Sequence, residues 1–158
     1  MPAFMLTPFL HAHSQLLCSS YQRLTGRTLI DQASAPLPTG MLLAEALYNA
    51  DVAVVSHDTA ADPIFNYANR QAQALFAYDW AQFVSLPSRL SAEPMLREAR
   101  DALLQRVARD GYVDDYAGVR VAGDGRRFMI TRATVWNLLD ADGTYRGQAA
   151  CIHDWHAI

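Results

Sequence analysis

The chain has 158 residues, 51% hydrophobic and 18% charged, a balance that fits one folded domain with a core of its own. Its formal net charge is −3 and its 13 Lys and Arg residues form no basic cluster, which argues against a nucleic-acid partner. No apolar run approaches the roughly 20 residues of a transmembrane helix, and no secretory signal pattern is present, so we expect a cytoplasmic protein without a membrane partner.

The first predicted element is a helix that begins at Thr7-Pro8, a hydroxyl cap followed by proline, and ends at Gly26. Apolar side chains recur along it at spacings of three and four residues: Phe9, Leu10, His13, Leu16, Leu17, Tyr21 and Leu24. Residues 31–40, which contain proline, predict a linker that lets this helix lie apart from the main body. We therefore divide the chain into residues 1–36, helix and linker, and residues 37–158, the main domain.

The next part of the chain predicts alternating short elements. After a second helix at residues 41–49, residues 52–57 and 64–68 have the pattern of two paired strands. Short helical segments are expected at residues 70–76 and 80–84. A longer helix is predicted to begin at residues 91–94 and to end at Gly111, with one apolar face made of Leu96, Ala99, Leu103 and Val107.

The C-terminal part, residues 114–154, predicts three antiparallel strands in a meander, because two turn signals separate its β-rich runs, at residues 122–125 and 140–143. The middle strand carries apolar side chains on both parities. Phe128, Ile130 and Trp136 share one parity, and Met129, Ala133 and Val135 share the other. We therefore expect both faces to be covered, one by helices and the other by a further helix or a second copy of the chain.

This order of elements is that of a PAS domain, an α+β fold in which five antiparallel strands carry short helices on one face; here an extra N-terminal helix precedes it. Six separated segments also resemble the MEKHLA family: IFNYAN at 64–69, LPSRLSAEP at 86–94, DYAGVR at 115–120, GRRF at 125–128, ATVWNL at 133–138 and GQAA at 147–150. The resemblance covers roughly residues 41–155 and leaves out the first helix. The family is PAS-related and occurs as stand-alone bacterial proteins and in plant homeodomain-leucine zipper regulators, which implies a sensory or partner-binding domain.

The resemblance to PAS proteins also bears on cofactors. Flavin photoreceptors of this fold carry a reactive cysteine after the short helices, where this chain has LPSRL at residues 86–90. Haem-binding members commonly take an axial histidine from the longer helix, and residues 95–110 contain none. We therefore expect neither a flavin adduct nor haem, and we assign no cofactor.

A ligand pocket is predicted around Arg120. Tyr116 and Arg120 lie on the same side of their strand, and comparison with flavin-binding PAS domains indicates that this side faces the cavity. A buried guanidinium needs an anion, which is either an internal carboxylate, Asp115 or Glu93, or a small carboxylate ligand. Strand alternation then gives a predicted pocket of Tyr116, Arg120, Met129, Thr131, Val135 and Gln148.

Two members of this set carry a second interpretation. Arg89, in the loop above the cavity, is either a further ligand contact or a solvated surface residue. The small neighbours of Gln148 leave room either for a ligand or for close packing of the crossing helix.

The sequence thus predicts a sensory, ligand-binding or interaction module that signals through a homodimer. Two apolar surfaces have no assigned partner: the stripe of the first helix, and the side chains of Phe128, Ile130 and Trp136, which we expect to face outward. The first helix is therefore expected either to cover the outer sheet face or to pair with its mate in the dimer.

The alternative is a small-molecule enzyme of the isomerase or dehydratase type, with Tyr112, Asp114, Asp115 and Tyr116 as its acid–base groups. Consecutive residues in a strand point to opposite faces, so Asp114 and Asp115 cannot form a dyad, and we assign no catalytic residue.

A metal site is also considered and not assigned. In the PAS strand order the first and last strands are neighbours, which would bring His57 toward His153, with His156 nearby. Cys18 and Cys151 lack CxxC spacing and are expected to be buried small hydrophobes rather than disulfide partners or zinc ligands.

Overall fold

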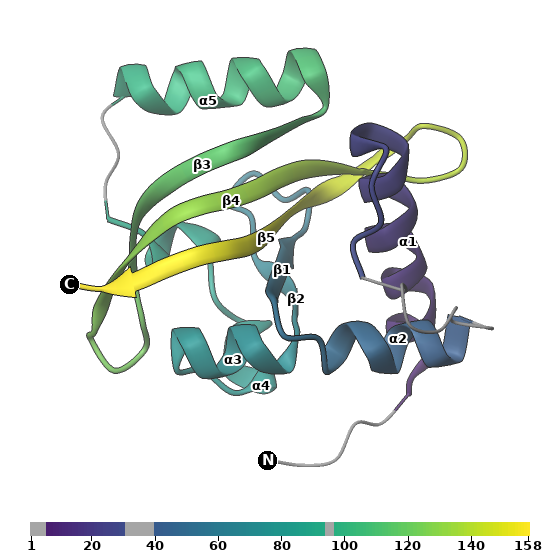
Figure 1. The fold of residues 1–158 in the computed structure, drawn as a ribbon, viewed down its shortest axis with the longest axis horizontal. Helices are drawn as coiled ribbons and strands as arrows, with labels where there is room; N and C mark the ends of the chain where they lie inside the picture. Colours follow the sequence, from purple (N-terminus) through teal and green to yellow (C-terminus); the bar gives the residue numbers. More distant parts are fainter. Residues whose placement is uncertain (1–5, 31–39, 94–96) are drawn as a thin grey trace.

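The computed structural model describes residues 6–30, 40–93 and 97–158 (Figure 1). Its elements are α1 (Pro8–Thr25), α2 (Gly40–Tyr48), β1 (Ala53–His57), β2 (Phe65–Ala68), α3 (Arg70–Phe76), α4 (Trp80–Phe83), the 3-10 helix η1 (Ser88–Ser91), α5 (Arg97–Asp110), β3 (Tyr112–Val121), β4 (Arg127–Leu139) and β5 (Tyr145–Ala157). The five strands form one antiparallel sheet in the order β2-β1-β5-β4-β3. The predicted α+β architecture is confirmed.

The two faces of the sheet belong to separate hydrophobic clusters. The inner face, which carries Val55, Phe65, Ala133, Val135 and Ile152, packs against α3, α4 and α5. The outer face, which carries Val54, Tyr67, Trp136, Leu138 and Cys151, packs against α1 and α2. Figure 1 shows α1 beside the β4–β5 end of the sheet, with α3 and α4 grouped near β1 and β2 and α5 running alongside β3.

Phenylalanine rings fill the inner side. Phe83 lies 4.9 Å from Phe65 and 5.4 Å from Phe76 between ring centroids, and Phe76 lies 5.2 Å from Phe128. All three contacts are edge-to-face, the arrangement that aromatic quadrupoles favour. The inner core is therefore a continuous aromatic cluster between the sheet and the short helices.

The alternation predicted for the middle strand fails at a bulge. The pairing of β4 with β5 shifts register between Ile130 and Ala133, so residues on either side of the shift change parity relative to the sheet. Phe128 and Ile130 consequently join Ala133 on the inner face, and only Trp136 faces outward as predicted. The prediction that Phe128, Ile130 and Trp136 share the outward face is wrong.

Helix α1 has the predicted caps. The Thr7 hydroxyl accepts a hydrogen bond from the Leu10 amide, and Gly26 ends the helix with a φ of 73°. The helix packs on the outer face, so the expectation that it lies apart from the main body is wrong; this helix, rather than a second copy, covers that face. The predicted linker, residues 31–39, and the predicted boundary between 36 and 37 lie outside the described residues.

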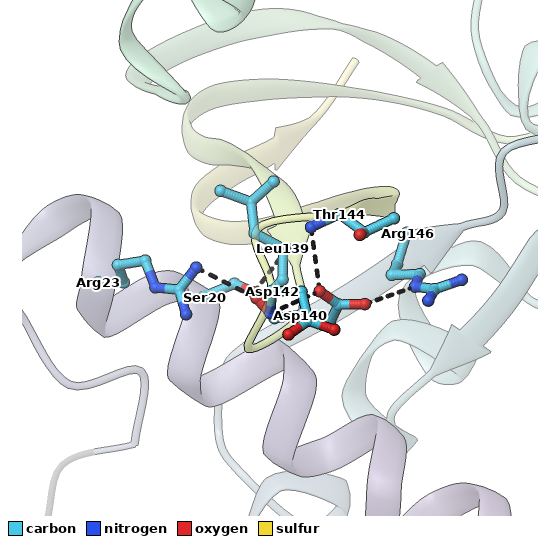
Figure 2. Close-up of polar contacts among 7 residues, drawn as sticks. All are labelled: Ser20, Arg23, Leu139, Asp140, Asp142, Thr144 and Arg146. Atoms are coloured by element: carbon cyan, nitrogen blue, oxygen red, sulfur yellow. Dashed lines mark hydrogen bonds and ion pairs between the residues drawn. The ribbon is translucent and has the colours of Figure 1, made fainter.

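Polar groups hold the C-terminal half of α1 to the sheet. The buried Ser20 hydroxyl donates to the Leu139 carbonyl and accepts from the Leu139 amide, both at 2.9 Å (Figure 2). Arg23 donates to the carbonyl of Asp140 at 3.2 Å, and the Asp140 carboxylate in turn accepts from the amides of Asp142 and Thr144. The helix is thereby fixed to the β4–β5 turn.

The longer helix differs from its prediction at its start. Ser91 closes η1, and Ala92 pairs with Arg120 in an isolated β-bridge, so the chain is extended where a helix start was expected. Of the predicted apolar face, Val107 and Leu103 contact the inner core, Ala99 is exposed, and Leu96 lies outside the described residues. No described helix is long and apolar enough to cross a membrane.

Candidate functional site

Arg120, on β3, has two neutral side chains as its hydrogen-bond partners. Its Nη1 donates to the Ser91 hydroxyl at 3.1 Å and its Nη2 to the Tyr116 hydroxyl at 3.2 Å. The guanidinium carbon also lies 5.6 Å from the centre of the Tyr116 ring. Its Nε is buried and has no hydrogen-bond partner among the described residues. A buried N–H of this kind leaves one donor direction open for an acceptor.

The internal ion pair considered for Arg120 is absent. Asp115 pairs instead with Arg106 of α5 at 2.8 Å, and Glu93 pairs with Arg127. Among the described residues Arg120 makes no ion pair at all. The interpretation that Asp115 or Glu93 neutralises this arginine is therefore wrong.

The backbone around Arg120 brings its two partners into place. A Cβ at Gly118 would lie 2.8 Å from the Tyr116 hydroxyl, so the missing side chain gives that hydroxyl room to reach the guanidinium. The Ala92–Arg120 bridge holds η1 against β3, and Ser91, fully buried, donates to the Ser88 carbonyl at 2.8 Å while it accepts from Arg120. The arrangement is a fixed cationic site on the edge strand, suited to an anion.

Gln148, which was predicted to line the same pocket, lies far from Arg120. Arg120 lies opposite Phe128 and Gln148 lies opposite Asn137, so nine residues of β4, roughly 30 Å of strand, separate them. Gln148 donates to the side chain of Asn137 at 3.3 Å.

The remaining predicted pocket residues are also placed elsewhere. Val135 is part of the packed inner core. Because of the bulge, Met129 and Thr131 do not share the inner face of Ala133 and Val135, and Thr131 is exposed. Arg89 is exposed and pairs with Asp62 at 3.1 Å. Of the predicted set, only Tyr116 and Arg120 lie together.

The acid–base set of the enzyme alternative is likewise dispersed. Asp114 pairs with Arg27, just after α1, at 3.6 Å, while Asp115 pairs with Arg106 of α5. Both carboxylates are exposed, and the Tyr116 hydroxyl is engaged with Arg120. The consecutive aspartates thus point to different helices, as strand geometry requires.

The histidines considered for a metal site do not converge. β1 and β5 are neighbours as predicted, but His57 lies opposite Gln148 and His153 lies beyond the Ala53–Ile152 pair, roughly 16 Å away along the strand. The idea that His57 and His153 are close is therefore wrong. The described residues contain no cluster of three or more His, Cys, Asp or Glu side chains that could hold a metal ion.

A buried polar contact that we did not predict lies under α1. The ring of His13, only 6% exposed, bonds through Nε2 to the Ser56 hydroxyl at 2.8 Å, and that hydroxyl donates to the side-chain oxygen of Asn66. Since the single hydroxyl proton goes to Asn66, His13 carries its own proton on Nε2. Burial lowers the pKa of His13 to about 4, so the ring is neutral at neutral pH. Its place in the apolar stripe of α1 was the one sequence signal for this burial.

Three groups of known proteins resemble the chain. Residues 11–157 match the MEKHLA domain family, so the match takes in most of α1, which the resemblance in sequence had left outside. The homeobox-leucine zipper protein HOX9 of Oryza sativa is 28% identical over 146 residues in both the indica and the japonica subspecies, covering 90% of this chain and 16% of that protein. The chain thus spans about one sixth of the length of these relatives.

Solved structures agree in fold. A PAS domain from Colwellia psychrerythraea aligns with a TM-score of 0.61 and 17% identity, over 72% of this chain and 94% of that one. An RNA-binding light-oxygen-voltage receptor gives a TM-score of 0.61 and 22% identity, over 78% and 37%. A light-oxygen-voltage domain studied with a flavin analogue gives a TM-score of 0.56 and 17% identity, over 74% of this chain and 84% of that one. The fold is that of a PAS domain, and the chain belongs to the MEKHLA domain family.

Proposed function

We propose that this chain is a sensory module that binds a small carboxylate at Arg120. The observation that carries the proposal is the buried, unpartnered Nε of a guanidinium that no described carboxylate neutralises. A ligand carboxylate would supply both the missing acceptor and the missing negative charge. A charge-assisted contact of this kind contributes about 1.5–3 kcal/mol.

The experiment is a thermal-shift screen of small carboxylates, with phenylacetate as one member. A ligand at a hundred times its dissociation constant stabilises the folded state by about 2.7 kcal/mol, which corresponds to a rise in melting temperature of roughly 5–10 °C. The rise should vanish in Arg120→Met and persist in Arg89→Met, which removes an exposed arginine of equal charge. Shifts that persist in a folded Arg120→Met protein would contradict the proposal.

We also propose that the module works without a flavin. The packing of Phe65, Phe76, Phe83 and Phe128 argues against room for a flavin ring between the sheet and the short helices, so the described residues do not fit that cofactor. The segment at residues 86–90 also lacks a cysteine. Purified protein should be colourless and insensitive to light; visible absorbance that follows the protein through gel filtration would contradict this.

Signal transfer by association of two copies stays a prediction, as does a cytoplasmic location. Of the two apolar surfaces that suggested a dimer, the α1 stripe packs on Trp136 within one chain, and Phe128 and Ile130 lie in the inner core. Support now comes from the Phe9 side chain on α1, which is 46% exposed and stacks on the buried His13 ring at 4.8 Å. A partner helix on Phe9 would thus contact the ring that stacks on the buried His13.

The enzyme alternative draws no support from its residues, because Asp114 and Asp115 each face a different arginine. We propose that the chain has no catalytic role. Turnover of a small substrate that Asp115→Asn abolishes, in a protein that still folds, would reverse this conclusion.

A further inference from the structure

A hollow lies on the outer side of the molecule, away from Arg120. Its volume is about 680 Å³, a size that suits a small organic molecule. Three segments enclose it: the end of α1 with the chain that follows, the connection from α2 to β1, and the outer face of β5. Its lining residues are Tyr21, Thr28, Leu29, Ile30, Asn49, Ala50, Asp51, Val52, Cys151 and His153.

The charge in this hollow is negative. Asp51 is the one acidic side chain among the described residues that line it, it is exposed, and it makes no ion pair with a described residue. The C-terminal end of α2 lies directly before it, and a helix C-terminus carries a partial negative charge. Arg27, next to the lining residue Thr28, is paired with Asp114 at 3.6 Å, so its charge is offset.

The other titratable groups of the lining are neutral near neutral pH. Burial, the largest effect, lowers the pKa of His153, whose Nε2 bonds to the buried Thr134 hydroxyl at 2.8 Å. Burial also raises the pKa of the Cys151 thiol to about 12 and raises the pKa of Tyr21. Arg132, whose charge acts on Cys151 and His153, is paired with Asp154 at 3.3 Å, so its charge is offset like that of Arg27. Among the described lining residues, a cation in the hollow would therefore meet one carboxylate and no charged arginine or lysine.

Part of the wall is apolar. Leu29, Ile30 and Val52 are partly buried against the outer hydrophobic cluster and turn part of their surface to the hollow. Their side chains offer a surface for hydrocarbon rather than for a hydrated ion, and a bare metal ion would find one carboxylate and few oxygen ligands.

We propose that this hollow binds a small organic cation, an ammonium or guanidinium group on an apolar body, with its charge at Asp51 and its body on Leu29, Ile30 and Val52. The inference goes beyond the carboxylate site and does not depend on it. Together the two proposals place an anionic ligand at Arg120 and a cationic ligand in the hollow on the outer side.

Phenethylamine is the probe, and phenylacetate, which has a similar apolar body and the opposite charge, is its control. Calorimetric titration of the full chain should show saturable one-to-one binding of phenethylamine. Amide cross-peaks of Ile30, Val52 and Cys151 should move in ¹H–¹⁵N spectra. Phenylacetate should leave these cross-peaks in place.

Matched variants locate the site. Asp51→Asn should weaken phenethylamine binding roughly tenfold or more, as the loss of one charge-assisted contact implies. Asp101→Asn, which neutralises an exposed aspartate on α5, and Arg120→Met should both bind it as the natural chain does. If Asp51→Asn binds phenethylamine with unchanged affinity, or if phenylacetate moves the same cross-peaks, the proposal is wrong. Absence of saturation by phenethylamine at millimolar concentration would also overturn it.

The two proposals can fail separately. If no carboxylate raises the melting temperature but phenethylamine still binds, only the proposal for Arg120 is wrong. If carboxylates bind and Arg120→Met abolishes that binding, but phenethylamine does not bind at all, only the proposal for the outer hollow is wrong.

Discussion

The two faces of the sheet are stabilised in different ways. On the inner face the contacts are between apolar side chains, and the four phenylalanines Phe65, Phe76, Phe83 and Phe128 are each no more than 4% exposed. On the outer face, α1 buries His13, Ser14 and Ser20 together with its apolar residues. Burial of an apolar ring is insensitive to pH and to exact geometry, whereas a buried polar group is stabilising only when its hydrogen bonds are made.

The outer face also leaves polar atoms unpaired. The Ser14 hydroxyl, the Tyr67 hydroxyl and the Trp136 indole N–H are buried without a partner among the described residues. Each such group costs about 1–3 kcal/mol relative to a paired one. We therefore expect the packing on the outer face to be lost first when pH or sequence is changed, and the packing on the inner face to persist.

Removal of α1 should have the largest effect. Deleting residues 1–36 would expose Trp136, Tyr67 and Leu138, each fully buried in the complete chain. An apolar surface of this size is not stable in water, so we expect an aggregating protein or one without cooperative unfolding. Gel filtration and thermal denaturation measure this, with deletion of residues 1–5 as the control. An unchanged elution volume and melting temperature would show that α1 does not hold the outer face.

Acid should loosen the outer face before the inner one. His13 has a pKa of about 4 when folded and 6.5 when free, so the unfolded chain binds more protons between these values and stability falls as pH drops through that window. The full loss is about 3 kcal/mol. Urea unfolding at pH 7.5 and pH 4 should show this loss in the natural chain and in His11→Gln, an exposed neighbour on the same helix. Equal acid dependence in His13→Gln would contradict the assignment.

The smallest of the three effects concerns one hydroxyl. Ser20→Ala leaves both the amide and the carbonyl of Leu139 without their partner, which should cost about 1–3 kcal/mol. Ser19→Ala is the matched control, since the exposed Ser19 hydroxyl bonds only within its own helix, to the Leu16 carbonyl at 3.5 Å. Chemical denaturation should separate the two variants; equal stability would mean that the Ser20 contact adds nothing to docking.

Local signals in the sequence predicted the elements well. Thr7, Pro8 and Gly26 mark the ends of α1, and the turn residues mark the three long strands, because these features depend on neighbours in sequence. The register shift between Ile130 and Ala133 has no comparable local signal, since it depends on the pairing of β4 with β5. The two irregularities in this stretch, Ile130/Arg132 and Arg132/Ala133, changed the face of the preceding residues Phe128, Met129, Ile130 and Thr131.

The candidate site shows the same limit. The sequence placed Arg120 and Tyr116 on one face because they are four residues apart on one strand. It could not show that Asp115 would pair with α5 or that Gln148 would lie at the far end of the sheet, since both depend on long-range packing. The stripe included His13 but did not show its bond to Ser56, and Ser20 escaped notice, because an apolar stripe gives no sign of which polar groups its partner surface offers.

The central claim, that Arg120 is an open anion site, is tested most directly by the NMR signal of its own Nε–H group. The cross-peak is identified by its absence in Arg120→Lys. On saturation with a carboxylate that raises the melting temperature, the Arg120 Nε proton should move downfield as it gains an acceptor, while the cross-peak of the exposed Arg89 stays in place. A stationary Arg120 cross-peak in a protein saturated with that carboxylate would place the ligand elsewhere and contradict the account.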